Sequence, residues 1–156
     1  MNDPNDLVFR DGVYHAFYQH NPDADVWGPM HWRHATSPDL FRWRDCGIVL
    51  APDEHGCIFS GSAVVDHHNS SGLAPGGQPG PLVAVFTHHL EQSHPGPAHV
   101  GRRQRQSLAY STDDGAVWHK YHGNPVLDPR QADFRDPGSL DGRRPRSALG
   151  DGGSRR

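Results

Sequence analysis

Residues 34–43 read His-Ala-Thr-Ser-Pro-Asp-Leu-Phe-Arg-Trp, and residues 108–118 read Leu-Ala-Tyr-Ser-Thr-Asp-Asp-Gly-Ala-Val-Trp. The two segments form a degenerate repeat in which a strand-like run leads through a polar turn to a tryptophan. A short apolar segment follows each tryptophan, at 48–50 and at 126–127. Successive four-stranded sheets that each close with a turn and a tryptophan-bearing strand are typical of β-propellers. The repeat therefore predicts an all-β fold built from propeller blades.

Short β-branched and aromatic runs surround this repeat, and none of them shows the apolar period of a helix. Asp11-Gly12 separates the first two runs, and this dipeptide favours a tight hairpin. Two polar connectors, 70–80 and 91–105, are interpreted as surface loops because they are dense in Gly, Pro, Ser, Gln or Arg. The expected strands are Leu7–Arg10, Val13–Gln19, Met30–Thr36, Leu40–Trp43, Cys57–Asp66, Pro81–His89, Gln106–Ser111 and Val117–Tyr121.

The composition excludes several classes of protein. Leu, Ile, Val and Phe account for 29 of the 156 residues, which is near the lower limit for a packed core. A formal charge of −3 gives no indication of nucleic-acid binding, and no apolar run approaches the roughly 18 residues of a membrane span. The first residues lack the basic and apolar regions of a secretory signal, which favours a cytoplasmic location for the chain as given. The oligomeric state stays open.

The thirteen histidines and two cysteines raise the question of a metal site. Cys46 and Cys57 are too few for a disulfide framework or a zinc site of the C-x-x-C type. His67-His68 and His88-His89 are adjacent pairs, and neighbouring residues on a strand point to opposite faces of the sheet. We therefore expect no metal site and no cofactor.

A set of short motifs, each weak when taken alone, carries the chemistry of the site. Asp3 by itself would be interpreted as part of an Asx-Pro turn. The motifs are, in order, Asn2-Asp-Pro-Asn5, Phe17-Tyr-Gln-His-Asn-Pro22, Trp27-Gly-Pro-Met-His-Trp32, Phe59-Ser-Gly-Ser-Ala-Val64 and Phe134-Arg-Asp-Pro137. In this order and at these intervals they closely resemble glycoside hydrolase family 32, the invertases, levanases, inulinases and sucrose-6-phosphate hydrolases. The resemblance extends from Met1 to about Pro137.

The resemblance implies a five-bladed β-propeller with an axial active site, of which this chain would cover about two blades and the start of a third. It also implies retaining hydrolysis of fructosyl linkages in sucrose or fructans. Asp3 would be the nucleophile, and the carboxylate of an ordinary aspartate is already ionised at neutral pH. Asp136 would bind sugar hydroxyls and stabilise the oxocarbenium-like transition state.

Six further positions match the substrate-binding residues of the family. Amide and hydroxyl groups pair with sugar hydroxyls, and aromatic rings cover the apolar C–H faces of a sugar. The matching residues are Asn2, Gln19, Trp27, Phe59, Ser60 and Arg135. Trp27 and Phe59 could alternatively be ordinary core residues. Trp32, Trp43 and Trp118 are expected in the core.

The chain departs from the family pattern at both ends. Asp6 stands where the family usually has glycine, and the tryptophan that usually precedes Met1 is missing. After Pro137 the sequence becomes rich in glycine and arginine, so we expect a domain over 1–137 and a disordered tail over 138–156.

The general acid of the family is the most important departure. It is a glutamate in a Glu-Cys motif, which does not occur here, and the only glutamates are Glu54 and Glu91. A retaining glycosidase needs one carboxyl to attack and another to protonate the leaving oxygen. We therefore expect the chain to be a hydrolase by ancestry and inactive alone.

Other classes stay open. Residues 111–118 fit the Asp-box pattern S-x-D-x-G-x-x-W of sialidase-like propellers, but the arginine cluster and tyrosine nucleophile of a sialidase cannot be assigned. Five-bladed glycosidases that act on arabinan or xylan do not explain Phe-Ser-Gly-Ser beside Asn-Asp-Pro-Asn. The non-enzyme alternative is an inert or fructan-binding propeller fragment, whose open sheets leave unpaired strand edges and one uncovered face.

Overall fold

Two antiparallel sheets account for the regular structure in the computed structural model, which describes residues 2–91 and 102–138. The first sheet has the order β1 (Pro4–Arg10), β2 (Val13–His20), β3 (His31–Ser37), β4 (Arg44–Leu50). The second has the order β5 (Cys57–Val65), β6 (Leu82–Leu90), β7 (Arg103–Ser111), β8 (His119–Lys120), and β9 (Leu127–Gln131) also pairs with β7. Within the described ranges no helix is long and apolar enough to cross a membrane.

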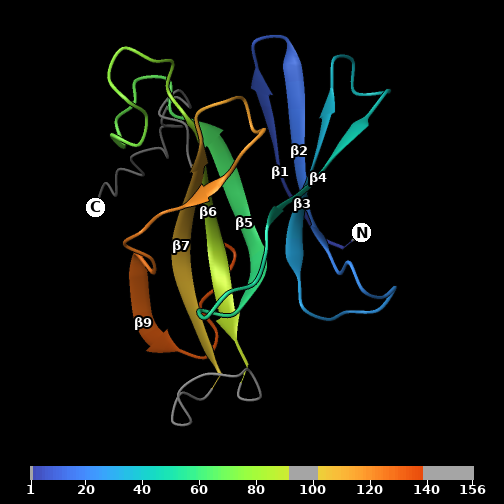
Figure 1. Cartoon of the computed structure of the whole chain (residues 1–156). Helices are drawn as coiled ribbons and strands as arrows, with labels where there is room; N and C mark the ends of the chain where they lie inside the picture. The colour runs from blue at the N-terminus through green and yellow to red at the C-terminus, as the bar shows by residue number, and fades with distance from the viewer. Residues whose placement is uncertain (1, 92–101, 139–156) are drawn as a thin grey trace, which may run out of the picture.

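The sheets stand side by side, and the faces that meet form the core (Figure 1). Two successive meanders packed in this way are the arrangement of neighbouring propeller blades. The predicted all-β fold is therefore confirmed. Residues 132–138 follow β9 without a further strand.

Trp32 lies at the centre of the contact between the sheets and is fully buried. Its ring centroid is 6.1 Å from those of Phe17 and Phe86, one from each sheet. Its indole Nε1–H donates to the backbone carbonyl of Phe59 at 2.9 Å. Because a buried indole N–H is costly unless it is paired, this bond fixes where β3 meets β5. The surrounding core comprises Val8, Phe17, Leu50, Ile58, Ala63, Leu82, Ala84, Phe86 and Ala109, with Trp118 packed against it.

The internal repeat occupies equivalent hairpins of the two sheets. In the β3–β4 connection, Ser37 Oγ donates to Asp39 Oδ1 at 3.2 Å, and this carboxylate accepts backbone N–H groups of the same turn. In the β7–β8 connection, Ser111 Oγ donates to Asp113 Oδ1 at 2.7 Å, and this carboxylate again accepts a backbone N–H. The Ser-x-Asp pattern thus closes each turn through side-chain to backbone bonds. The Asp-box residues accordingly have a structural role here.

Some strand predictions were wrong in detail. Residues 40–43 belong to the turn, because β4 begins only at Arg44. Trp43 is 42% exposed instead of lying in the core, since it precedes an edge strand and its indole N–H bonds to Leu40 of the turn. β7 begins at Arg103, inside the predicted loop 91–105, and β9 was missed because its sequence contains a proline.

Other predictions concern connections. Asp11 and Gly12 form the expected two-residue turn between Arg10 and Val13, and both have positive φ. The predicted loop 70–80 contains no strand. The predicted disordered tail falls almost entirely on residues 139–156, which lie outside the described residues, as do residues 92–101.

Candidate active site

The start of β1 lies beside the end of β2, and this pairing builds the first part of the site. The backbone N–H of Asn2 donates to the carbonyl of Gln19 at 2.9 Å, and the N–H of Gln19 donates to the carbonyl of Asp3 at 3.0 Å. The Asn2 amide also donates to Gln19 Oε1 at 3.4 Å. In Figure 1 the chain enters here, at the end of β1 opposite the β1–β2 turn. Asn2 and Gln19, which were both predicted to bind substrate, are therefore fixed next to Asp3.

The second sheet contributes Ser60 from β5. Gln19 Nε2 donates to Ser60 Oγ at 3.0 Å, and Ser60 Oγ donates to Asp3 Oδ2 at 3.5 Å. Gln19 is buried and Asp3 is exposed. The carboxylate of Asp3 is thus presented to solvent while a buried amide and a hydroxyl orient one of its oxygens. An accessible carboxylate whose neighbours are fixed is chemically able to act as a nucleophile.

Aromatic rings form one wall beside this group. The Trp27 ring meets the Phe59 ring edge to face, with centroids 5.9 Å apart, and Trp27 is 60% exposed. The β2–β3 loop holds Trp27 through the Asn21 side chain, which donates to the Val26 carbonyl at 2.9 Å. A small polar cavity of about 140 Å³ opens next to the tryptophan. Its lining includes Asn2, His20, Asn21 and Met30.

Arg135 and Asp136 are held by the second sheet through a different route. Phe134, which precedes them, is bound by the side chains of Gln104 and Gln106 on β7. Arg135 Nε lies 3.8 Å from Asp136 Oδ2, and Asp136 is exposed with a φ of 60°. The structure therefore joins Asn2, Asp3, Gln19 and Ser60 in one hydrogen-bonded group. It also brings the rings of Trp27 and Phe59 into contact. It attaches Arg135 and Asp136 to β7, without a direct hydrogen bond to Asp3 among the described residues.

Asp6, which stands where the family usually has glycine, forms two hydrogen bonds through its side chain. Its Oδ2 accepts the backbone N–H of Ala63 on β5 at 2.8 Å, and its Oδ1 accepts the N–H of Leu7 at 2.8 Å. The side chain therefore ties β1 to β5 next to Asp3, across the contact between the sheets. Asn5 lies between Asp3 and Asp6 in the sequence. The nitrogen and oxygen of its side-chain amide are both buried and have no hydrogen-bond partner in the described part of the chain.

Sequence reasoning missed His89, which packs against the aromatic wall, and Gln104 and Gln106, which bind the backbone of Phe134. His89 is buried and stacks on Phe59, with ring centroids 4.1 Å apart and planes 10° from parallel. The two glutamines fell partly inside the predicted loop 91–105. The signal that could have found them is their spacing of two residues in Arg-Gln-Arg-Gln, which on a strand places both glutamines on the same face.

A second arrangement, Ser107-His88-Asp53, has the order of a nucleophilic triad. His88 Nδ1 lies 2.7 Å from Ser107 Oγ, and His88 Nε2 lies 3.3 Å from Asp53 Oδ1. Burial lowers the pKa of His88, although Asp53 opposes this. Burial acts to raise the pKa of Asp53, but the His88 and Lys120 hydrogen bonds outweigh it and hold the pKa well below its usual range. Because Ser107 and His88 are fully buried, no substrate reaches them, and we assign the group to the structure of the sheet.

A larger cavity, of about 450 Å³, lies at the other end of β1 and is unrelated to these residues. Arg10 lines it, with Asp114 at 3.1 Å and Asp11 at 3.4 Å, so the buried guanidinium is already paired. Among the residues that the structure describes, no three His, Cys, Asp or Glu side chains are grouped so that they could hold a metal ion. Cys46 and Cys57 are both free.

At one end of two propeller-like sheets, a carboxylate has amide, hydroxyl and aromatic neighbours. These are the types of side chain that bind sugars, so the fold and the site indicate a carbohydrate-binding β-propeller protein. Residues 1–144 match the family described as Glycosyl hydrolases family 32 N-terminal domain. The levanase of Bacillus subtilis is 51% identical over 138 residues, which cover 88% of this chain and 19% of the levanase. The invertase of Schizosaccharomyces pombe is 45% identical over 144 residues, which cover 88% of this chain and 23% of the invertase.

Solved structures agree with this assignment. The β-fructofuranosidase of Schwanniomyces occidentalis complexed with fructosyl-erythritol gives a TM-score of 0.76 at 37% identity, over 87% of this chain and 26% of that one. The exo-inulinase of Aspergillus awamori gives a TM-score of 0.72 at 39% identity, over 87% of this chain and 29% of that one. The chain belongs to glycoside hydrolase family 32, and the predicted partial propeller is confirmed. It spans about a fifth to a quarter of the length of the levanase and the invertase.

Proposed function

We propose that the site binds a terminal fructosyl unit of sucrose or a fructan, and that the chain is the nucleophile-bearing part of a retaining β-fructofuranosidase-type hydrolase. The observation that carries this proposal is the hydrogen-bonded group of Asn2, Asp3, Gln19 and Ser60 beside the Trp27–Phe59 wall. Support comes from the solved relative that was complexed with fructosyl-erythritol. No nucleic acid or membrane enters the proposed function.

In the proposed reaction, an oxygen of Asp3 attacks the anomeric carbon of the fructosyl unit, and the bond from that carbon to the leaving oxygen breaks. A fructosyl ester of Asp3 forms, and water then attacks the same carbon and releases fructose and the free carboxylate. The proton that this water loses balances the one that the leaving oxygen takes up. Ser60 and Gln19 hold the attacking carboxylate in one orientation. Asp136 and Arg135 bind sugar hydroxyls, with bonds that strengthen as positive charge develops on the ring.

Natural fructosides also need a proton donor for the leaving oxygen, at a carboxyl separation of roughly 5 to 5.5 Å. Glu91 is hydrogen-bonded to His89 at 2.5 Å, and Glu54 lies in the connection between β4 and β5. Neither belongs to the hydrogen-bonded group around Asp3. We propose that the isolated chain binds fructosyl groups and hydrolyses sucrose, levan or inulin at least about a hundredfold more slowly than an enzyme with a general acid.

The test uses β-fructofuranosyl fluoride, because fluoride leaves without a proton donor. We expect the full chain to release fluoride and to form a fructosyl ester detectable by mass spectrometry of the intact protein, while sucrose gives no measurable fructose. Asp3→Asn should abolish fluoride release, because a neutral amide is a poor nucleophile. Asp23→Asn, on an exposed loop aspartate, is the matched control and should leave the rate unchanged.

The outcomes separate the alternatives. Fluoride release that is equal in wild type and Asp3→Asn would eliminate Asp3 as the nucleophile. Fructose binding without any ester would favour the fructan-binding alternative, and the absence of both binding and ester would favour the inert one. Sucrose hydrolysis that is as fast as in an enzyme with a general acid, and that Asp3→Asn abolishes, would keep the nucleophile and overturn the proposed need for a further carboxyl.

A further inference from the structure

Two buried glutamines of β7 hold the backbone of Phe134, one through its N–H and the other through its C=O. Gln104 Oε1 accepts the backbone N–H of Phe134 at 2.7 Å, and Gln106 Nε2 donates to the backbone carbonyl of Phe134 at 2.6 Å. The exposed fractions of Gln104 and Gln106 are 0% and 5%. Each bond joins residues about thirty positions apart in the sequence. The segment that leads to Asp136 is therefore fixed to β7 through side chains.

The remaining amide groups of the two glutamines are also paired. Gln106 Oε1 accepts the hydroxyl of Thr87 at 3.1 Å, and Gln104 Nε2 lies 3.1 Å from His89 Nδ1. An amide nitrogen can only donate, so His89 Nδ1 accepts and the ring proton resides on Nε2. That proton is directed to Glu91 Oε1 at 2.5 Å. The network thus assigns one tautomer to His89 and leaves no Gln104 group unpaired.

His89 connects this network to the aromatic wall. Its ring is buried and nearly parallel to that of Phe59 at a centroid distance of 4.1 Å, and Phe59 in turn contacts Trp27. A hydrogen bond on one side of the imidazole and a stacked ring on its face fix the orientation of both partners. Gln104 therefore bonds both to His89, which supports Phe59, and to the backbone N–H of Phe134, which precedes Arg135 and Asp136.

We propose that Gln104 is a positioning residue of the fructosyl site, which couples the aromatic wall to the Arg135–Asp136 segment through His89 and Phe134. The part that concerns sugar rests on the proposed function. A fully paired buried polar network is rigid, and an exposed residue at a φ of 60° keeps that conformation only if its neighbours are fixed. The aromatic wall and the Arg135–Asp136 segment, which come from different parts of the chain, are thereby held at a fixed distance from each other.

Three substitutions in the full chain test the coupling. Gln104→Met keeps the size of the side chain and removes both hydrogen bonds. Gln104→Glu keeps an acceptor for the Phe134 N–H and removes the donor to His89. Gln131→Met is the matched control, because Gln131 is exposed on β9 and is the strand partner of Gln104. Backbone order parameters of Arg135 and Asp136 are measured without sugar, and D-fructose affinity is measured by chemical-shift titration.

In Gln104→Met we expect the order parameter of Asp136 to fall from near 0.85 to below about 0.6, and the dissociation constant for fructose to rise at least about tenfold. In Gln104→Glu we expect Asp136 to stay ordered, while the ring signals of Phe59 shift and fructose binding weakens by a smaller factor. Gln131→Met should match wild type in all three measurements. A mere loss of stability would not produce this separation between the two Gln104 variants.

Asp136 that remains as ordered in Gln104→Met as in wild type would overturn the coupling, whatever the sugar result. Unchanged fructose affinity in Gln104→Met, with wild type binding fructose, would also overturn the positioning role. If wild type binds no fructose and Asp136 still loses order only in Gln104→Met, the coupling stands and the proposed function fails.

Discussion

His34 is a buried histidine at the contact between the two sheets, and its surroundings disfavour a positive charge. Its ring stacks on Phe17 at 4.7 Å, and its Nε2 lies 3.1 Å from Nδ1 of the buried His15. Burial, together with the neighbouring His15, lowers the pKa of His34 to about 4. Burial likewise lowers the pKa of His15, which Asp114 partly opposes. Both rings are therefore neutral when the chain is folded at neutral pH.

The depressed pKa of His34 predicts a loss of stability in mild acid. The unfolded chain takes up the proton near pH 6.5 and the folded chain only near pH 4, so the stabilisation is complete above pH 6.5 and decreases between these values. With allowance for solvent around the site, the free energy of unfolding should fall by on the order of 2 kcal/mol over this interval. Urea denaturation at several pH values measures it.

The comparison with His34→Phe reports on His34 together with its partner His15, because carboxylates titrate alike in both proteins. The variant should lose about 2 kcal/mol less between pH 6.5 and 4 than wild type does. His67→Phe, at an exposed position in the connection after β5, should keep the wild-type pH dependence. An identical pH dependence in wild type and His34→Phe would show that His34 does not contribute.

At the scale of the element, the β7–β8 hairpin presses a glycine against the first sheet. Gly115 has a φ of 84°, and a Cβ built on it would lie 2.9 Å from Cε1 of His34. Gly115→Ala therefore combines left-handed strain of about 1 to 2 kcal/mol with a clash against a buried ring. We expect a loss of about 2 to 4 kcal/mol in the free energy of unfolding, measured by thermal or urea denaturation.

Gly77 provides the matched control for this substitution. Its φ is 82°, and a Cβ there meets nothing within 4 Å. Gly77→Ala should cost only the strain, about 1 to 2 kcal/mol. Equal losses of unfolding free energy in Gly115→Ala and Gly77→Ala would mean that the hairpin does not pack closely against the His34 ring.

The elements could be predicted where the chain carries its own local signal. Asp11-Gly12 fixes the first hairpin, and the Ser-x-Asp turns fix the third strand connection of each sheet. β4 could not be placed from its residues, because this edge strand is exposed along most of its length and shows no alternating burial. The predicted strand starts at Gln106, after the true start of β7, because Arg103-Gln-Arg-Gln resembles a polar loop. Only the packing of the folded chain shows that its glutamines are buried.

At the scale of the whole molecule, short motifs predict the candidate site residues, whereas the residues that support them are brought together only by folding. Asn2, Gln19 and Ser60 can be named from short motifs because each motif is local. His89, Gln104 and Phe134 meet only after β5, β6, β7 and the segment after β9 assemble. A sequence pattern shows which residue types are present, whereas the coupling depends on distances that tertiary packing sets.

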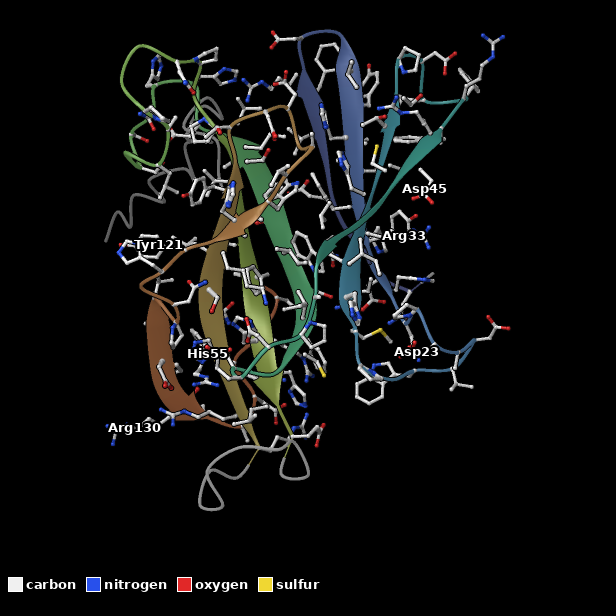
Figure 2. The ribbon with its side chains drawn as sticks, viewed as in Figure 1. Asp23, Arg33, Asp45, His55, Tyr121 and Arg130 are labelled. Carbon is white, nitrogen blue, oxygen red and sulfur yellow. The ribbon has the colours of Figure 1, made fainter. Side chains whose placement is uncertain are left out.

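The face of the first sheet that points away from the second is uncovered in the described part of the chain. Leu7 and Phe9, two positions apart on β1, are 51% and 56% exposed. Figure 2 shows Arg33 and Asp45 on this side of the sheet, and they form an ion pair there. Apolar side chains gathered on one exposed face promote association, because contact with another apolar surface removes them from water.

We expect the purified chain to self-associate reversibly at micromolar concentration through this face, as measured by sedimentation velocity over a range of concentrations. The double variant Leu7→Gln, Phe9→Gln should shift the equilibrium toward monomer by at least about tenfold, because it removes most of the apolar area of β1 from the contact. Val117→Gln is the control, since Val117 is 51% exposed but lies alone on the β7–β8 hairpin. It should associate as wild type does. A wild-type chain that stays monomeric throughout the range would show that the Arg33–Asp45 pair and the neighbouring polar groups suffice to keep the open face in water.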